Sequence, residues 1–214
     1  ELGCTISENS NLEILKSFVG DIAWNFKYCE TYVNKHVEIA EAIGQLRDPQ
    51  VAYYLMRWSC AASRMNYLIR TTPQTHCGPA LLRSDHVITA AFCNTTGLPL
   101  DDLATTQSAF PVRMGGLGLR SSVTTAGAAY LGSRSATHVR CAELRHGHRW
   151  EHTTAGYLQD AGNYCKKFLV DAGILNDVID VSSPDLNQSR ISSFIDKAKV
   201  QIWKSTAIPD QICN

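Results

Sequence analysis

Long apolar runs are missing from this chain of 214 residues. A helix that crosses a bilayer needs roughly 18 or more consecutive apolar residues, and no stretch comes near that length. A charged-then-apolar leader is also missing at the start. The eight cysteines fall mostly within helical patterns, and a chain of this size does not need disulfides, so we expect them to be reduced and buried. The sequence therefore predicts no membrane partner and an intracellular location, nuclear or cytoplasmic.

Paired motifs of the kind that hold zinc are missing as well. Zinc sites usually need two close pairs of cysteine or histidine at fixed short spacings. The one cluster of such side chains has a single cysteine, and two of its histidines stand two residues apart, so they cannot share a helix face: Cys141, His146, His148 and His152. We expect a polar helix end or linker and no bound metal, with a zinc-dependent module as the weaker alternative.

Catalytic signatures are absent too. The chain has no GxSxG elbow, no GxxxxGK loop and no GxGxxG before a helix. Asp101 and Asp102 form an adjacent carboxylate pair, which polymerases use to hold two metal ions, but they follow Leu98-Pro99-Leu100 and not a buried strand. We interpret this pair as a helix cap, and we expect no cofactor.

Lysine is missing from the middle of the chain. Residues 1–50 carry 8 acidic and 4 basic side chains, residues 51–150 carry 4 acidic and 10 basic, and residues 151–214 carry 8 acidic and 6 basic. The net charges are −4, +6 and −2, and all ten central cations are arginine. Because the guanidinium fork suits phosphate, the middle is the candidate nucleic-acid contact. An Arg-rich solvated face of a helical bundle is the alternative.

The longest helical pattern runs from Asp48 to Pro73. Asp48 suits an N-cap, Pro49 suits the first helical position, and Pro73 makes Thr72 the expected exit. Apolar side chains recur at spacings of three and four, which predicts one continuous buried stripe: Val51, Leu55, Trp58, Ala62, Met65 and Ile69. We expect the other elements to pack around this helix.

Further helical patterns flank it. A helix over 26–46 has its own apolar stripe, with His36 at the edge as a satisfied core or boundary residue. Because Arg47 and Asp48 leave little room for a loop, the two helices are expected to form a tight antiparallel hairpin. The apolar pattern over 12–19 predicts one or two helical turns. Other helices are expected over 80–93, 101–108, 122–144, 155–172 and 189–203.

Residues 110–122 break the helical rhythm with three glycines within four positions: Gly115, Gly116 and Gly118. Glycine permits positive φ and very close packing against a neighbour. No buried strand precedes these glycines, so they predict a structural turn in place of a nucleotide-binding loop. The fold class is therefore mainly α: a helical bundle built on a long antiparallel helix hairpin, with a Gly-rich turn segment and a small helical C-terminal appendage.

Several segments, in this order, resemble the region downstream of the catalytic palm in reverse-transcriptase-like proteins of non-LTR retrotransposons. They are Asp48-Pro49-Gln50, MNYLIRTTP over 65–73, and FPVRMGGLGLRS over 110–121. An Ala-rich helix with a Tyr130-Leu131 pair follows, and Leu2-Gly3 resembles the dipeptide that closes the family's palm. The likeness covers roughly residues 1–145. Gln74 stands where the family often has a second proline.

The resemblance implies a thumb and a following helical region that grip a template-primer duplex by its backbone. It divides the chain into a palm-proximal extended piece with a short helix, a helical thumb-like core and a helical C-terminal appendage: 1–25, 26–145 and 146–214. The implied contacts are five arginines, for each of which a surface ion pair or a carbonyl cap is the alternative: Arg57, Arg64, Arg70, Arg113 and Arg120.

The same resemblance sets the expected activity and partners. The chain lacks the family's fingers, palm and metal-binding aspartates, so the isolated chain is expected not to be an enzyme, although a parent protein would be an RNA-directed DNA polymerase. The expected partners are the backbone of RNA or an RNA–DNA duplex and an upstream palm domain. The alternative is a helical protein-interaction scaffold derived from such an element, without nucleic-acid binding.

Overall fold

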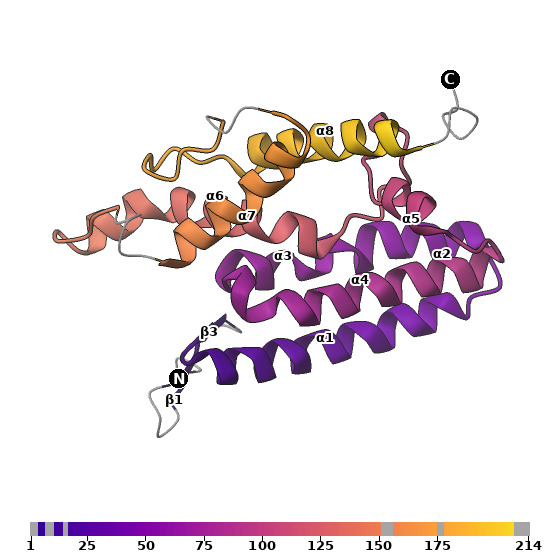
Figure 1. Ribbon diagram of the computed structural model, residues 1–214. Helices are drawn as coiled ribbons and strands as arrows, with labels where there is room; N and C mark the ends of the chain where they lie inside the picture. The colour runs from indigo at the N-terminus through magenta and orange to yellow at the C-terminus, as the bar shows by residue number, and fades with distance from the viewer. Residues whose placement is uncertain (1–3, 7–10, 15–16, 151–155, 175–177, 208–214) are drawn as a thin grey trace.

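A computed structural model describes residues 4–6, 11–14, 17–150, 156–174 and 178–207 (Figure 1). The predicted mainly α fold class is confirmed. None of the helices in these ranges is long and apolar enough to cross a bilayer. The elements are β1 (Cys4–Ile6), β2 (Leu12–Ile14), β3 (Ser17–Val19), α1 (Ile22–Gly44), α2 (Pro49–Leu55), the π-helical turn η1 (Met56–Cys60), α3 (Ala62–Thr71), α4 (Gln74–Thr96), α5 (Asp102–Ser108), the 3₁₀ turn η2 (Val112–Met114), α6 (Ser122–Leu144), α7 (Gly156–Asp171) and α8 (Gln188–Thr206).

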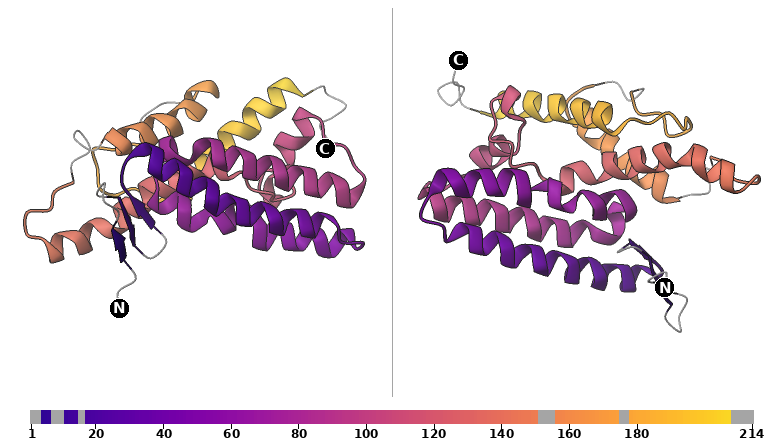
Figure 2. Two further views of the ribbon diagram at one scale, coloured as in Figure 1. Left: turned by 90° about the horizontal axis from the view of Figure 1, so that it is seen from below. Right: turned by 180° about the vertical axis from the view of Figure 1, so that it is seen from behind.

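Three long helical arms lie side by side in the first half of the molecule (Figures 1 and 2). α1 runs outward, α2, η1 and α3 bring the chain back, and α4 runs outward again, so the predicted antiparallel hairpin is present. Asp48 caps α2, since its Oδ1 accepts hydrogen bonds from the backbone N–H groups of Gln50 and Val51 at 2.9 and 3.1 Å. The predicted exit at Thr72 is the C-cap of α3.

Two hydrophobic clusters hold the three arms together. The cluster nearer the start of α1 also includes Ala126 and Ala129 of α6. Its other members come from α1, α3 and α4: Cys29, Val33, Met65, Leu68, Ile69, Cys77, Ala80 and Leu81. The cluster nearer the end of α1 includes Leu119 of the glycine-rich segment and residues of α1, α2, η1 and α4: Ala40, Ile43, Ala52, Met56, Cys60, Ile88, Ala91 and Phe92.

The second layer consists of α6, α7 and α8 (Figure 1). A third cluster joins Ala128, Tyr130 and Leu131 of α6 to apolar residues of α7, α8 and the segment between them. Successive residues of α6 therefore face both layers. The predicted division near residue 145 coincides with the end of α6, but α6 itself contributes to the core of the C-terminal helices.

The prediction of helical turns over 12–19 is wrong. β2 and β3 form an antiparallel pair, and β1 pairs with the other edge of β2. So short a segment cannot offset the cost of helix nucleation, and burial of Phe18 beside Trp24 of α1 favours the extended form. Leu2-Gly3, the dipeptide of the palm resemblance, lies outside the described residues.

The predicted continuous stripe over 51–69 is wrong in its first half. Val51, Leu55 and Trp58 are 48%, 38% and 66% exposed, whereas the neighbouring face of α2 and η1 is buried. The buried residues on that face are Ala52, Met56 and Cys60. The chain then leaves helical geometry at one residue, Ala61, whose ψ is −155°. The arm is thus two helices joined by a π-helical turn, and the π-turn changes which face meets the core.

His36 of α1 was expected to be a satisfied residue, and this prediction is wrong. Its side chain is 1% exposed, and neither ring nitrogen has a hydrogen-bond partner in the described part of the chain. Burial, and secondarily the charge of Arg64, lowers the pKa of His36 from 6.5 to about 4. The folded protein therefore holds this imidazole neutral, without the hydrogen bonds that would offset its burial.

Replacing His36 with leucine is expected to stabilise the protein. In the wild type the unfolded chain takes up a proton near pH 6.5 that the folded chain binds only near pH 4, so stability is complete above pH 6.5 and falls as the pH drops toward 4. His36→Leu removes this loss, which is about 2 kcal/mol at pH 5, and also an unsatisfied polar group, which adds about 1 kcal/mol at every pH. Urea unfolding between pH 5 and 7.5 measures it, with the exposed His86→Leu as control. An unchanged pH dependence would refute the assignment.

Candidate functional site

The glycine-rich segment 110–120 lies across the break in the α2–α3 arm. Tyr53 donates its hydroxyl to the carbonyl of Leu117 at 2.7 Å, and the backbone N–H of Ala62 donates to the carbonyl of Arg120 at 3.3 Å. The segment also closes on itself, because Gly118 N donates to the Phe110 carbonyl at 2.9 Å. The break removes a backbone hydrogen bond from the helix, and the bond from Ala62 to the carbonyl of Arg120 partly replaces it.

Two of the three glycines in this segment have conformations that other residues rarely adopt. φ is +82° at Gly115 and +71° at Gly118. Gly116 has an ordinary φ but no room for a side chain, since a Cβ there would lie 2.2 Å from the carbonyl oxygen of Phe110 and 2.5 Å from that of Gln107. These three residues therefore shape the turn, and nothing about them requires a bound ligand.

Arg57 packs against this turn. Its guanidinium lies 4.8 Å from the centroid of the Trp58 ring, and its Nη1 is 3.5 Å from the hydroxyl of Tyr53. A Cβ on Gly118 would come within 2.9 Å of its Nε. Arg57 thus fills the space between an exposed indole and the glycine turn, which leaves it less available to a ligand than a free surface arginine.

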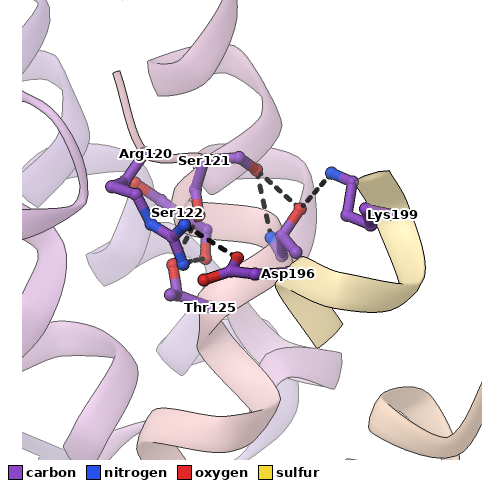
Figure 3. A network of polar contacts seen from close by, with 7 residues as sticks. Arg120, Ser121, Ser122, Thr125, Asp196 and Lys199 are labelled. Atoms are coloured by element: carbon purple, nitrogen blue, oxygen red, sulfur yellow. Dashed lines mark hydrogen bonds and ion pairs between the residues drawn. The ribbon is translucent and has the colours of Figure 1, made fainter. Parts of the chain in front are cut away.

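Arg120 belongs to an internal polar network between α6 and α8 (Figure 3). Its Nη1 lies 2.7 Å from Oδ1 of Asp196, which is buried. Nearby, Lys199 Nζ donates to Thr124 Oγ1 at 3.1 Å, and burial, together with the charge of Arg120, lowers the pKa of Lys199. Arg120 is therefore paired and joins the two layers, so its charge is not available to a ligand at the surface.

Asp85 of α4 anchors the other side of this region. Its carboxylate accepts hydrogen bonds from the Ser121 hydroxyl at 2.7 Å and from the backbone N–H groups of Ser122 and Val123 at 2.8 and 3.2 Å. Burial raises the pKa of Asp85, although these hydrogen bonds oppose the shift. The start of α6 is thus capped by a residue from another helix, which sequence reasoning missed because capping by a distant residue leaves no local pattern.

Arg64, Arg70 and Arg113 are exposed, unlike Arg57 and Arg120. Within the described ranges no carboxylate lies in salt-bridge range of any of the three. Arg64 and Arg70 lie in α3, and Arg113 lies in η2. The five predicted arginines therefore divide into two that are engaged internally and three whose charges face solvent.

Two open grooves bring Arg70 and Arg113 to the start of α8. One groove of about 640 Å³ is lined by Arg70 and by 185–189, and the other, of about 690 Å³, by Arg113 and by α8. Both include Asn187 and Ser189, so they meet at the N-terminus of α8. Asn187 caps that helix by accepting from Arg190 N at 3.0 Å.

The Arg113 groove carries further positive charge that the sequence did not indicate. Arg190 and Lys197 line it together with Phe194, and each cation lies 5.9 Å from the centroid of that ring. No acidic side chain lines this groove among the residues that the structure describes, whereas Asp185 lines the Arg70 groove. The more basic of the two surfaces is therefore the one around Arg113.

Within the described residues, no three histidine, cysteine or acidic side chains are placed to hold a metal ion. In the predicted cluster, His148 instead contacts His138 of α6, with 3.2 Å between Nε2 and Nδ1. His152 lies in the part of the chain that the structure leaves undescribed. The zinc-dependent alternative gains no support from the other members, Cys141 and His146.

Comparisons with known proteins assign no family to the chain. No protein-family model, no curated protein and no solved structure matches it. The resemblance to retroelement reverse transcriptases therefore stays a hypothesis that rests on the ordered motifs.

Proposed function

We propose that this chain is a non-catalytic C-terminal piece of a retroelement reverse transcriptase and that it contacts the backbone of an RNA–DNA duplex. The observation that carries this proposal is the meeting of two grooves, lined by Arg70 and Arg113, at the N-terminus of α8. Both arginines lie in the motifs that resemble the retroelement family. Both are exposed, and within the described ranges neither has an acidic partner.

The chemistry of this surface suits phosphate. Guanidinium groups bind phosphate oxygens in a bidentate way, and the N-terminus of a helix carries partial positive charge. In α8 the N–H groups of Gln188 and Ser189 are the ones left for an anion, because those of Arg190 and Ile191 donate to Asn187. Arg190 and Lys197 add two cations from the same helix. Contacts of this kind read the backbone and not the bases, so binding should depend steeply on salt and little on sequence.

Changing Arg70, Arg113 and Arg190, which all line the two grooves, together to glutamate tests the proposal. We expect the affinity for an RNA–DNA hybrid at low salt to fall on the order of 100-fold, and the slope of log affinity against log salt to decrease by about 3, one for each lost phosphate contact. Fluorescence anisotropy titrations at several salt concentrations measure both quantities. The reason is the loss of three cations that the described structure leaves uncompensated.

A matched control keeps the total charge change the same. In Arg47→Glu/Arg83→Glu/Arg140→Glu, all three side chains are exposed, and Arg83 and Arg140 already pair with Glu30 and Glu143 at 2.8 Å. This control should retain most of the affinity. The proposal would be refuted if the two triple variants lost affinity equally, or if the wild type did not bind the hybrid at low salt.

A second candidate function is a helical protein-interaction scaffold without nucleic-acid binding. It is favoured by the exposed apolar side chains of α2 and η1, namely Val51, Tyr54, Leu55 and Trp58. Leu55 also lines a mostly apolar groove of about 400 Å³ with Leu46 of the loop after α1 and with residues of α1: Glu38, Ile39, Ala42 and Ile43. Exposed patches of this kind are typical of protein-binding surfaces.

The simplest partner for this patch is a second copy of the chain. On this candidate function, sedimentation equilibrium should show self-association that rises with protein concentration and is lost in Leu55→Glu/Trp58→Glu. Val139→Glu, which changes an exposed apolar residue of α6 outside the patch, should leave it intact. A monomer at every concentration would contradict self-association through this surface.

A further inference from the structure

A separate pocket of about 300 Å³ lies where α6 ends and α7 begins. α6 contributes Arg134 and His138, and the following loop contributes Arg145, His148, Arg149 and Trp150. The pocket shares no lining residue with the grooves at α8. It is therefore independent of the duplex-binding surface proposed above.

The pocket has positive charge and no negative charge among its described lining residues, since three arginines and no carboxylate contribute to it. Arg134 and Arg145 are exposed, and neither makes a salt bridge within the described ranges. Arg149 is fixed differently, because its Nη1 donates to the carbonyls of His146 and His148 at 3.3 and 3.1 Å. Two guanidinium groups thus remain available at the pocket.

Hydrogen bonds and ring contacts fix the aromatic side chains that line the pocket. Trp150 donates its Nε1–H to the carbonyl of Val181 at 3.0 Å and lies edge-on to the ring of His138. His138 Nδ1 and His148 Nε2 lie 3.2 Å apart, so one of these two nitrogens donates and the other accepts. The accepting ring then carries its own N–H on its other nitrogen, so the pair offers one imidazole N–H to a ligand.

We propose that this pocket binds a phosphate-bearing ligand. Guanidinium and imidazole N–H groups are the donors that proteins use for phosphate, and the volume is at the small end of ligand pockets, enough for a phosphate group with a small organic part. The C-terminal end of α6 disfavours an anion, and the arginines outweigh it because a helix end carries only about half an elementary charge.

Calorimetric titration of the full chain with inorganic phosphate and pyrophosphate tests the proposal. We expect saturable binding that weakens at least tenfold in Arg134→Gln/Arg145→Gln. Arg140→Gln is the matched control, since this arginine lies on the same helix, pairs with Glu143 and does not line the pocket. Absence of saturable binding to either probe, or equal affinity in the double variant and the wild type, would overturn the proposal.

The source of the phosphate is distinguished by a second set of probes. In the Arg70→Glu/Arg113→Glu/Arg190→Glu background, a nucleoside monophosphate is compared with a short single strand that does or does not carry a 5′-phosphate. If the mononucleotide binds, the ligand is a free phosphorylated compound. If the mononucleotide does not bind and the 5′-phosphorylated strand binds more tightly than the unphosphorylated one, the ligand is the phosphorylated end of a strand. In this background the basic surface at α8 has lost three arginines, so any remaining binding reports on the α6–α7 pocket. The result is therefore informative whether or not the chain binds a duplex.

Discussion

Replacing Gly116 with alanine is expected to lower the free energy of unfolding by about 4 kcal/mol, among the largest effects of a single substitution. The new Cβ would lie 2.2 Å from the carbonyl oxygen of Phe110 and 2.5 Å from that of Gln107. Both are backbone atoms, so no side-chain rotation can relieve the contact. The turn that lies across the α2–α3 break has to move, and with it the hydrogen bond from Tyr53 to Leu117.

Urea unfolding of Gly116→Ala and of a control, Gly147→Ala, measures this effect. Gly147 has no atom within 4 Å of the position its Cβ would take, so alanine there should change stability by less than about 0.5 kcal/mol. If Gly116→Ala does not fold, Gly118→Ala gives a milder test of the same turn, through a positive φ and the contact with Arg57. Wild-type stability in both turn variants would contradict the observed packing.

Replacing Asp85 with alanine is expected to cost about 3 kcal/mol, the second largest effect. The carboxylate accepts from two backbone N–H groups at the start of α6 and from the Ser121 hydroxyl, and alanine leaves all three donors without this partner. Since α6 contributes to the cores of both layers, loosening of its first turn weakens the contact between them.

Asp102→Ala is the matched control for this prediction. Asp102 is exposed in the first turn of α5, where its charge interacts with the positive end of the helix, so we expect a loss below about 1 kcal/mol. Thermal unfolding of both variants, with amide exchange of residues 122–126, distinguishes a local from a global effect. Equal stability of the two variants would show that Asp85 does not support α6.

The sequence predicts most helices correctly because their ends carry local signals. Asp48 and Asp101 act as N-caps as expected, and Ser122 begins α6. The prediction of one continuous buried stripe over 51–69 is wrong for a reason that hydrophobic periodicity cannot reveal. The chain breaks at Ala61, and the backbone N–H of the next residue, Ala62, donates to the carbonyl of Arg120, which is a contact between distant segments.

The candidate site could be predicted only in part. Arg70 and Arg113 stand in motifs of recognisable order, and both line the grooves that meet at α8. Arg120 stands in the same motif but pairs with Asp196, a residue 76 positions further along the chain. Arg190 and Lys197 of α8 lie in the same groove as Arg113, and the sequence did not predict this. Local spacing carries no information on which distant segments are close in space.

Hydrogen–deuterium exchange of the full chain with and without an RNA–DNA hybrid tests the central proposal most directly. The first backbone N–H groups of a helix have no intrahelical partner, so a phosphate bound there slows their exchange. We predict slower exchange over 112–116 and 187–191 at low salt, which is reversed at high salt, with no change over 26–40 of α1. Protection confined to the apolar tip at 46–58, or no protection anywhere, would contradict a duplex contact at the start of α8.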